Sequence, residues 1–237
     1  MTVCETAGKQ HRDALAGRVS RLRAGELATV GGEDWAHFAA SWADLPADTF
    51  MADGGTYRQR RYAAFEMSRS GIMRLPHRPH FQERAHNTLN GGIARWFAPM
   101  EPAVADSGPF RHILRAMADK VAAHEAQPPA KWLVEAHQFR IVAQAGQPGL
   151  PTPEGMHRDG RDWVLICLIG SGNIGGGETL VRDGANRIVL RHRLMQPGEG
   201  LLLDDRMVRH ATSPITAIAK DAPAWRDTLV LTFARTA

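Results

Sequence analysis

The second half of the chain consists of short strand-like runs separated by turn residues, and this pattern constrains the fold more than any other feature. From Lys131 onward, runs rich in branched and aromatic residues alternate with short clusters of glycine, proline, asparagine and aspartate. Strands are predicted at residues 132–143, 164–169, 178–182, 187–194, 200–203, 207–211 and 228–233. Strands at this spacing favour a β-sandwich or barrel over a parallel α/β sheet.

The first half of the chain is dominated by helical periodicity. Apolar residues recur at helical spacing over residues 11–23, 33–45 and 109–127, whereas residues 57–76 have the pattern of a hairpin. No internal repeat, low-complexity tract or linker divides the 237 residues. We therefore expect an α+β fold in a single domain, residues 1–237, with a helical buttress at about 1–130 and a β core at about 131–237.

The composition is that of an ordinary globular protein, with 43% hydrophobic and 23% charged residues. The chain contains no run of about 18 apolar residues, so no membrane-spanning segment is expected. Two cysteines, Cys4 and Cys167, cannot build a disulfide framework, and Cys167 has the surroundings of a small buried hydrophobe. The first residues lack the apolar core of a signal peptide, and we expect a cytoplasmic protein with no membrane partner.

The net charge of +4 raises nucleic acid as a possible partner, but its distribution argues against one. Most basic residues are arginines scattered along the chain, and the densest group, at residues 58–61, is short. The glycine-rich stretch 170–177 is not a phosphate-binding loop, because no Lys-Ser/Thr pair follows it and the chain continues as a strand. We expect no nucleic-acid partner; a small anionic substrate would use one or two arginines.

The candidate chemistry centres on His157 and Asp159, which stand two residues apart just before a predicted buried strand. In extended chain such residues share a face, so both can bind one metal ion while Arg158 points the other way. His210 follows 53 residues later on another predicted strand, and Arg226 opens the last one. Two histidines and one carboxylate with open positions opposite them form the facial triad of non-haem Fe(II) oxygenases.

The order of these residues, together with the segments around them, resembles a known family. The segments are Pro153-Glu154-Gly155-Met156-His157-Arg158-Asp159-Gly160, Gly176-Gly177-Glu178-Thr179, Leu203-Asp204-Asp205, Arg209-His210, Ser213-Pro214-Ile215 and Trp225-Arg226-Asp227. Together they are similar to the bacterial 2-oxoglutarate/Fe(II) dioxygenases that hydroxylate free amino acids, of the isoleucine 4-hydroxylase type and the related pipecolic-acid hydroxylases. The likeness spans roughly residues 132–234. It implies a double-stranded β-helix, or jelly-roll, core.

The resemblance implies a role for several residues. His157, Asp159 and His210 would bind Fe(II), leaving positions for 2-oxoglutarate and O2. Arg226 would take the distal carboxylate of 2-oxoglutarate in a bidentate pair, with help from Thr228 and from Gln138. Related halogenases have no carboxylate at the position of Asp159. Its presence here therefore favours hydroxylation over halogenation.

Contacts to the substrate are expected from a further set of polar residues. Glu154 can pair with an amino group, and Arg140 lies on the strand that precedes the His157 loop. Arg158, Arg61 and Tyr57 complete the candidate set. Asp204 and Asp205 are more typical of residues that cap a strand end and hold neighbouring loops than of metal ligands.

The predicted activity is hydroxylation of an unactivated C–H bond of a free L-amino acid or cyclic imino acid, with decarboxylation of 2-oxoglutarate to succinate. Two alternatives stay open at the level of sequence. One is the same chemistry on a peptide, natural-product or nucleic-acid substrate, and the other is a metal-binding β-barrel without catalysis. The sequence also leaves the oligomeric state open, including a homodimer.

Overall fold

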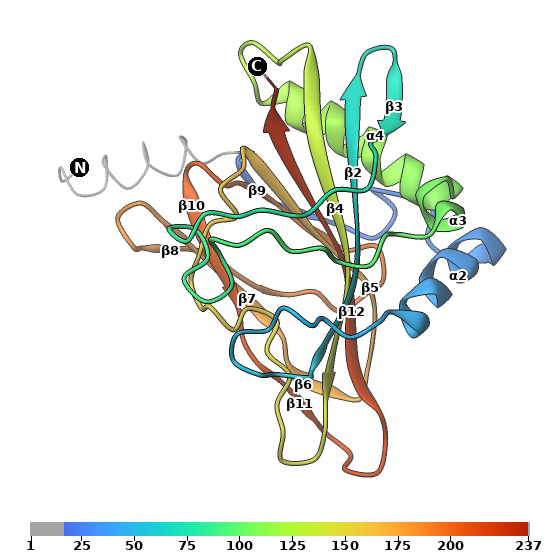
Figure 1. Cartoon of the computed structure of the whole chain (residues 1–237), viewed down its shortest axis with the longest axis vertical. Coiled ribbons are helices and arrows are strands. Elements are labelled where there is room, and N and C mark those ends of the chain that lie inside the picture. Colours follow the sequence, from blue (N-terminus) through green and yellow to red (C-terminus); the bar gives the residue numbers. More distant parts are fainter. Residues whose placement is uncertain (1–16, 237) are drawn as a thin grey trace, which may run out of the picture.

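The computed structural model describes residues 17–236, and a seven-stranded antiparallel sheet forms the centre of that part of the chain (Figure 1). Its strand order is β1-β9-β5-β12-β4-β2-β3. The strands are β1 (Val19–Leu22), β2 (Arg58–Ser68), β3 (Gly71–Arg74), β4 (Lys131–Ala143), β5 (Trp163–Gly172), β9 (Gly200–Asp204) and β12 (Ala224–Arg235). The long strands β2, β4, β12 and β5 run side by side and provide a broad surface on each face.

A smaller layer of strands covers one face of the large sheet. It contains a three-stranded sheet, β10-β7-β8, and a two-stranded sheet, β11-β6. Their bounds are β6 (Ile174–Gly176), β7 (Glu178–Asp183), β8 (Ile188–Arg193), β10 (Val208–Thr212) and β11 (Ile215–Ala217). This arrangement of two facing antiparallel layers agrees with the jelly-roll fold expected from the sequence.

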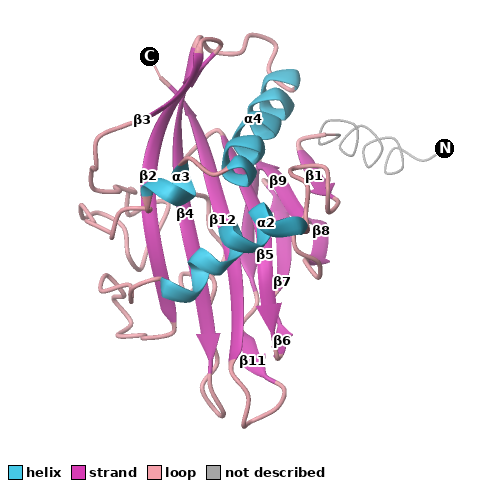
Figure 2. Ribbon diagram, turned by 90° about the vertical axis from the view of Figure 1, so that its right-hand side faces the viewer, coloured by secondary structure: helices cyan, strands magenta, loops and turns pink. Residues whose placement is uncertain are grey.

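Helices cover the other face of the large sheet (Figure 2). They are α2 (Gly32–Ala40), a 3-10 turn (Ser41–Asp44), α3 (Pro102–Ala105) and α4 (Gly108–Ala123). Ser107 caps α4 by accepting a hydrogen bond from the backbone N–H of Phe110, and the helix buries a face that includes Ile113 and Met117. No helix in the described chain is both long and apolar enough to cross a membrane.

The alternation of side chains on the large sheet divides the interior into two parts. On β5, Leu165 and Cys167 face the helices, whereas Val164 and Ile166 face the smaller layer. On β12, Leu229 packs with the first group. Because residues 163–169 of β5 are buried on both faces, polar residues that point between the two layers are shielded from solvent.

Most of the predicted elements are confirmed, and one is wrong. The helices at 33–45 and 109–127, the hairpin at 57–76 and the β-rich second half are all present. The helix at 11–23 is not, because residues 19–22 form β1, which pairs with the otherwise open edge of β9. The beginning of that segment lies outside the described residues. The first half therefore supplies three strands of the large sheet as well as helices.

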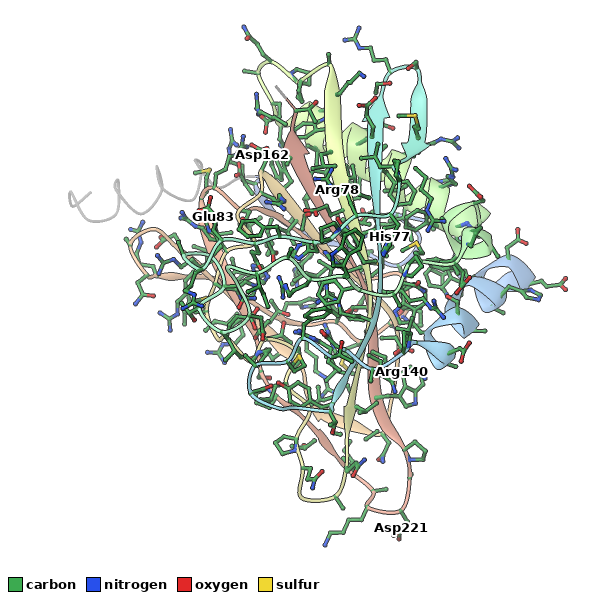
Figure 3. All side chains as sticks on the ribbon, viewed as in Figure 1. His77, Arg78, Glu83, Arg140, Asp162 and Asp221 are labelled. Atoms are coloured by element: carbon green, nitrogen blue, oxygen red, sulfur yellow. The ribbon has the colours of Figure 1, made fainter. Side chains whose placement is uncertain are left out.

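The loop between β11 and β12 extends away from the body of the molecule. Asp221 lies at its end, remote from the space between the layers (Figure 3). Its side chain is exposed. Because Asp221 is exposed and remote from the interior, its substitution can serve as a control for substitutions of buried residues.

Candidate active site

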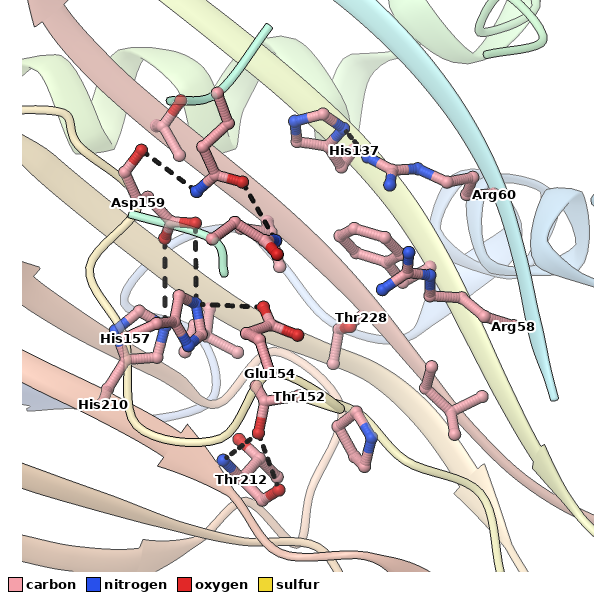
Figure 4. A pocket seen from close by; sticks show the side chains of 18 of the residues that line it. Arg58, Arg60, His137, Thr152, Glu154, His157, Asp159, His210, Thr212 and Thr228 are labelled. Atoms are coloured by element: carbon pink, nitrogen blue, oxygen red, sulfur yellow. Dashed lines mark hydrogen bonds and ion pairs between the residues drawn. The ribbon is translucent and has the colours of Figure 1, made fainter. Parts of the chain in front are cut away.

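His157, Asp159 and His210 meet between the two layers, although 53 residues separate the two histidines in the chain. His157 and His210 form a backbone bridge, with N–O distances of 3.0 and 2.9 Å, which sets their rings 4.5 Å apart. The Nε2 atoms of the two histidines each lie 3.8 Å from a different carboxylate oxygen of Asp159 (Figure 4). All three donor atoms lie within 4.8 Å of one another, so one metal ion can contact all of them.

A hydrogen bond directs the ring of His157 toward the shared centre. The carbonyl of Gly155 accepts a hydrogen bond from Nδ1 of His157 at 3.0 Å, which leaves Nε2 of that ring free to bind a metal. Burial would lower the pKa of His157, but the adjacent carboxylates of Asp159 and Glu154 outweigh it and raise the pKa to about 9. Burial and the neighbouring His157 lower the pKa of His210 to about 4.

Asp205 holds the loop that carries Asp159. Its carboxylate accepts hydrogen bonds from the backbone N–H groups of Asp159, Gly160 and Arg161, at 3.0, 2.8 and 3.1 Å. Burial and the charge of Asp159 raise the pKa of Asp205 to about 7. Asp204 pairs instead with Arg18. Both residues therefore organise loops, as the sequence indicated.

Replacing Asp205 with alanine is expected to weaken metal binding without removing a donor atom. Three backbone N–H groups would lose their acceptor, which costs about 2 kcal/mol or more of folding stability. Loss of such supporting contacts weakens metal binding by about 10- to 100-fold. Metal titration and thermal unfolding of the variant, with Asp221→Ala as control, measure both effects; unchanged metal affinity would contradict the role of Asp205.

A cavity of about 100 Å³ opens beside the three donors. It is lined by Arg58, Arg60, His80, Gln82, Asn87, Arg95, His137, Phe139, Ile141, Pro151, Thr152, Glu154, His157, Asp159, Arg161, Ile166, His210, Thr212, Arg226, Thr228, Val230 and Thr232. Arg226 is 3% exposed, and its Nη2 atom has no hydrogen-bond partner among the described residues. Burial and the nearby Arg193 lower the pKa of Arg226 to about 10, so the guanidinium is still charged at neutral pH.

The surroundings of Arg226 fit a carboxylate ligand. Thr228 lies two residues further along β12 and lines the same cavity, as strand alternation predicts. Gly177 lies against the arginine, where an added Cβ would be 3.5 Å from Cδ of Arg226, and its φ of +75° suits glycine. A buried guanidinium with an unused donor is suited to the distal carboxylate of 2-oxoglutarate.

Three of the predicted contact residues face away from the cavity, so these predictions are wrong. Gln138 donates a hydrogen bond to the Ser41 hydroxyl at 3.0 Å, and Arg140 pairs with Asp227 at 2.8 and 2.7 Å. Arg61 forms an ion pair with Glu101 at 2.7 Å. The reason is strand alternation: on β4 the odd-numbered positions from 137 to 141 line the cavity, and on β2 the even-numbered positions 58 and 60 do.

The other predicted substrate contacts divide in the same way. Tyr57 donates a hydrogen bond to Asp53, and Arg158 donates one to the carbonyl of Val208 at 3.2 Å, so neither lines the cavity. Glu154 does line it. Oε1 of Glu154 lies 3.6 Å from Nε2 of His157, while its buried Oε2 has no hydrogen-bond partner among the described residues.

The sequence did not point to a group of buried basic and aromatic residues on the far side of the cavity. Arg58 and Arg60 come from β2 and His137 from β4, whereas His80 and Arg95 come from the irregular chain between β3 and α3. A sequence signal existed for the strand residues only, since alternate positions of a predicted strand share a face.

The similarity of the whole sequence to a known protein family identifies the class of enzyme in which this cavity is found. The family model described as 2OG-Fe dioxygenase matches residues 39–232, which is most of the chain. The chain belongs to the 2OG-Fe dioxygenase family. It is accordingly an oxidoreductase that uses Fe(II), 2-oxoglutarate and O2, and the three clustered donors are able to bind the metal.

Individual relatives agree with this assignment. The dioxygenase is 28% identical over 179 residues to the 3(1)-hydroxy-L-isoleucine 4-dioxygenase of Pantoea ananatis (strain AJ13355), covering 74% of this chain and 72% of that protein. A crystal structure of a bsmA homolog from Methylobium petroleophilum PM1 superposes with a TM-score of 0.84 at 35% identity, covering 96% of this chain and 92% of that one. The structure of IDO from Bacillus thuringiensis shares the fold, with a TM-score of 0.79 at 18% identity and coverage of 97% and 99%.

Proposed function

We propose that this dioxygenase hydroxylates an unactivated C–H bond of a free L-amino acid or a cyclic imino acid. The observation that carries the proposal is the juxtaposition, in one cavity, of the three metal donors with two unsatisfied charged groups of opposite sign. Arg226 offers an unpaired N–H to a carboxylate, and Glu154 offers an unpaired oxygen to an amine.

His157, Asp159 and His210 are the proposed iron ligands. Their donor set fits Fe(II), because three ligands on one side leave three positions for 2-oxoglutarate and O2. Bound iron supplies the oxidising chemistry, in which 2-oxoglutarate loses CO2 to give succinate. The protein residues hold the co-substrate in a fixed orientation: Arg226 pairs with its distal carboxylate and Thr228 adds a hydroxyl.

Glu154 is the proposed anchor of the substrate amine. Its carboxylate lies beside the metal ligand His157, so an amine bound to it would bring the neighbouring carbons close to the metal. The relative from Pantoea ananatis acts, by its name, on a hydroxylated isoleucine, which supports a small amino-acid substrate here. Buried side chains of both layers line the cavity and would limit the access of water to the reacting carbon.

Succinate release across a panel of free amino acids and cyclic imino acids tests the proposal. We expect at least one compound to stimulate succinate formation well above the rate without it, and the product mass to rise by one oxygen atom. Omission of Fe(II), O2 or 2-oxoglutarate is the control for each active compound. If no free amino acid or imino acid is oxidised by protein that binds iron and 2-oxoglutarate, the proposed substrate class is wrong.

A further inference from the structure

Three arginines lie in the wall of the cavity, and among the described residues Asp48 is the only carboxylate within ion-pair distance of any of them. Arg58, Arg60 and Arg95 are 5%, 4% and 2% exposed, and we refer to them as the arginine cluster. Asp48 pairs with Arg58 at 2.8 Å and more weakly with Arg60 at 3.4 Å. Among the described residues, Arg95 has no carboxylate partner at all. The three guanidiniums therefore exceed by two the single carboxylate that contacts them among the described residues.

Neutral groups fill the remaining contacts of the cluster. Arg60 donates to Nδ1 of His137 at 2.7 Å, and Arg95 donates to Nδ1 of His80 at 3.1 Å. Burial and the adjacent arginines lower the pKa of both histidines well below the ordinary value, so both rings are neutral. The aromatic ring of Phe97 lies under Arg60, with 3.5 Å between the guanidinium carbon and the ring centroid.

These contacts leave donors unused. Nη2 of Arg58, Nε of Arg60 and Nε of Arg95 are buried without a hydrogen-bond partner among the described residues. Burying a charged donor without a partner is costly, and uncompensated cations of like charge repel one another. In the free protein these unpaired guanidiniums are unfavourable for folding. A ligand with negative charge and acceptor oxygens would pair with them, so the site is suited to such a ligand.

The arginine cluster is distinct from the guanidinium assigned to 2-oxoglutarate. Arg226 lies on β12, whereas Arg58 and Arg60 lie on β2, and β4 runs between these two strands. Glu154 lies between the metal donors and Arg58 in the view of Figure 4. It adds one negative charge to the wall of the same cavity. A substrate bound there would meet a carboxylate near the metal donors and guanidiniums further away.

We propose that the arginine cluster binds two acidic groups of the substrate, so that the preferred substrate is an amino acid with a second anionic group. This inference rests on the proposed function and narrows its substrate class. The amine pairs with Glu154, and the α-carboxylate together with a side-chain carboxylate or phosphate compensates the two excess guanidiniums. A neutral amino acid supplies only one of these anions and leaves one buried cation unmatched.

Calorimetric titration with acidic amino acids and with their neutral counterparts tests the proposal. The protein is loaded with Fe(II) and 2-oxoglutarate without O2, and is titrated with glutamate and glutamine, aspartate and asparagine, and 2-aminoadipate. O-Phosphoserine and serine separate a phosphate from a carboxylate as the second anion. We expect the best acidic ligand to bind at least about tenfold more tightly than its neutral partner, the effect of one charged hydrogen bond. Equal or tighter binding of every neutral partner would overturn the proposal.

Arg95→Met supplies the matched variant, because Arg95 has no carboxylate that its removal would leave unpaired. The preference for the acid over its neutral partner should fall about tenfold, while binding of the neutral compound stays the same. The free variant should unfold at an equal or higher temperature, since one repulsive cation is gone. Arg115→Met, at an exposed position of α4, is the control. A less stable variant with an unchanged acid preference would make Arg95 structural and overturn the proposal.

The same titrations without iron and 2-oxoglutarate separate this inference from the proposed function. Binding of an acid that depends on Arg95, in protein that oxidises no amino acid, would support the anion site and refute the hydroxylase proposal. Hydroxylation restricted to neutral amino acids, with no effect of Arg95→Met on their binding, would support the hydroxylase proposal and refute the anion site.

Discussion

The Asp159→Ala variant is expected to lose iron binding and to form no detectable succinate. Asp159 supplies the negatively charged donor of the cluster, with an oxygen 3.8 Å from Nε2 of each histidine. Without it, two neutral imidazoles would have to hold a divalent cation alone. Removal of His157 or His210 is expected to have the same result, because any pair of the three donors leaves the metal weakly held.

Metal titration of the purified variants checks this expectation separately from turnover. Asp159→Ala and His210→Ala should show no stoichiometric Fe(II) binding, whereas His112→Ala, at an exposed position of α4, should bind and turn over as the parent does. Thermal unfolding in the absence of metal shows whether each variant is folded. A folded Asp159→Ala protein that retains full turnover would remove this residue from the ligand set.

The clustering of the three candidate metal donors follows in part from rules of short range that can be read in the sequence. His157 and Asp159 are two residues apart in extended chain, and His210 falls on a strand that the alternation of apolar residues already indicated. The backbone bridge between His157 and His210 then sets the distance. The fold could be predicted to a similar degree, since the strands of the second half have clear boundaries in turn residues.

The other residues of the cavity wall could not be assigned from the sequence, because the directions of their side chains depend on contacts with distant parts of the chain. Gln138 was predicted on the correct strand but on the wrong face, because nothing in a single strand of mixed polar and apolar residues states which face meets the cavity. Arg95 lies in irregular chain, where no periodicity relates a residue to a direction. β1 was predicted as a helix because its strand pairing depends on β9, some 180 residues away.

The Arg226→Met variant is expected to bind 2-oxoglutarate about 10- to 100-fold more weakly, the effect of about 1.5–3 kcal/mol from a hydrogen-bonded charge. The Michaelis constant for 2-oxoglutarate should rise by this factor, while the maximal rate at saturating co-substrate should change less. Arg226→Lys should recover only part of the loss, because an ammonium cannot form the two parallel bonds of a guanidinium. Arg191→Lys, at an exposed position of β8, is the control.

The stability of the free protein distinguishes a binding role for Arg226 from a structural one. Its guanidinium is buried with an unused N–H and forms no ion pair among the described residues, so its removal leaves no anion unpaired. We therefore expect Arg226→Met to unfold at the same temperature as the parent or above it when 2-oxoglutarate is absent. Addition of 2-oxoglutarate should stabilise the parent more than the variant, because only a ligand bound to the folded state shifts its unfolding. An unchanged Michaelis constant together with a clear loss of stability would mean that Arg226 supports the sheet and that 2-oxoglutarate binds elsewhere.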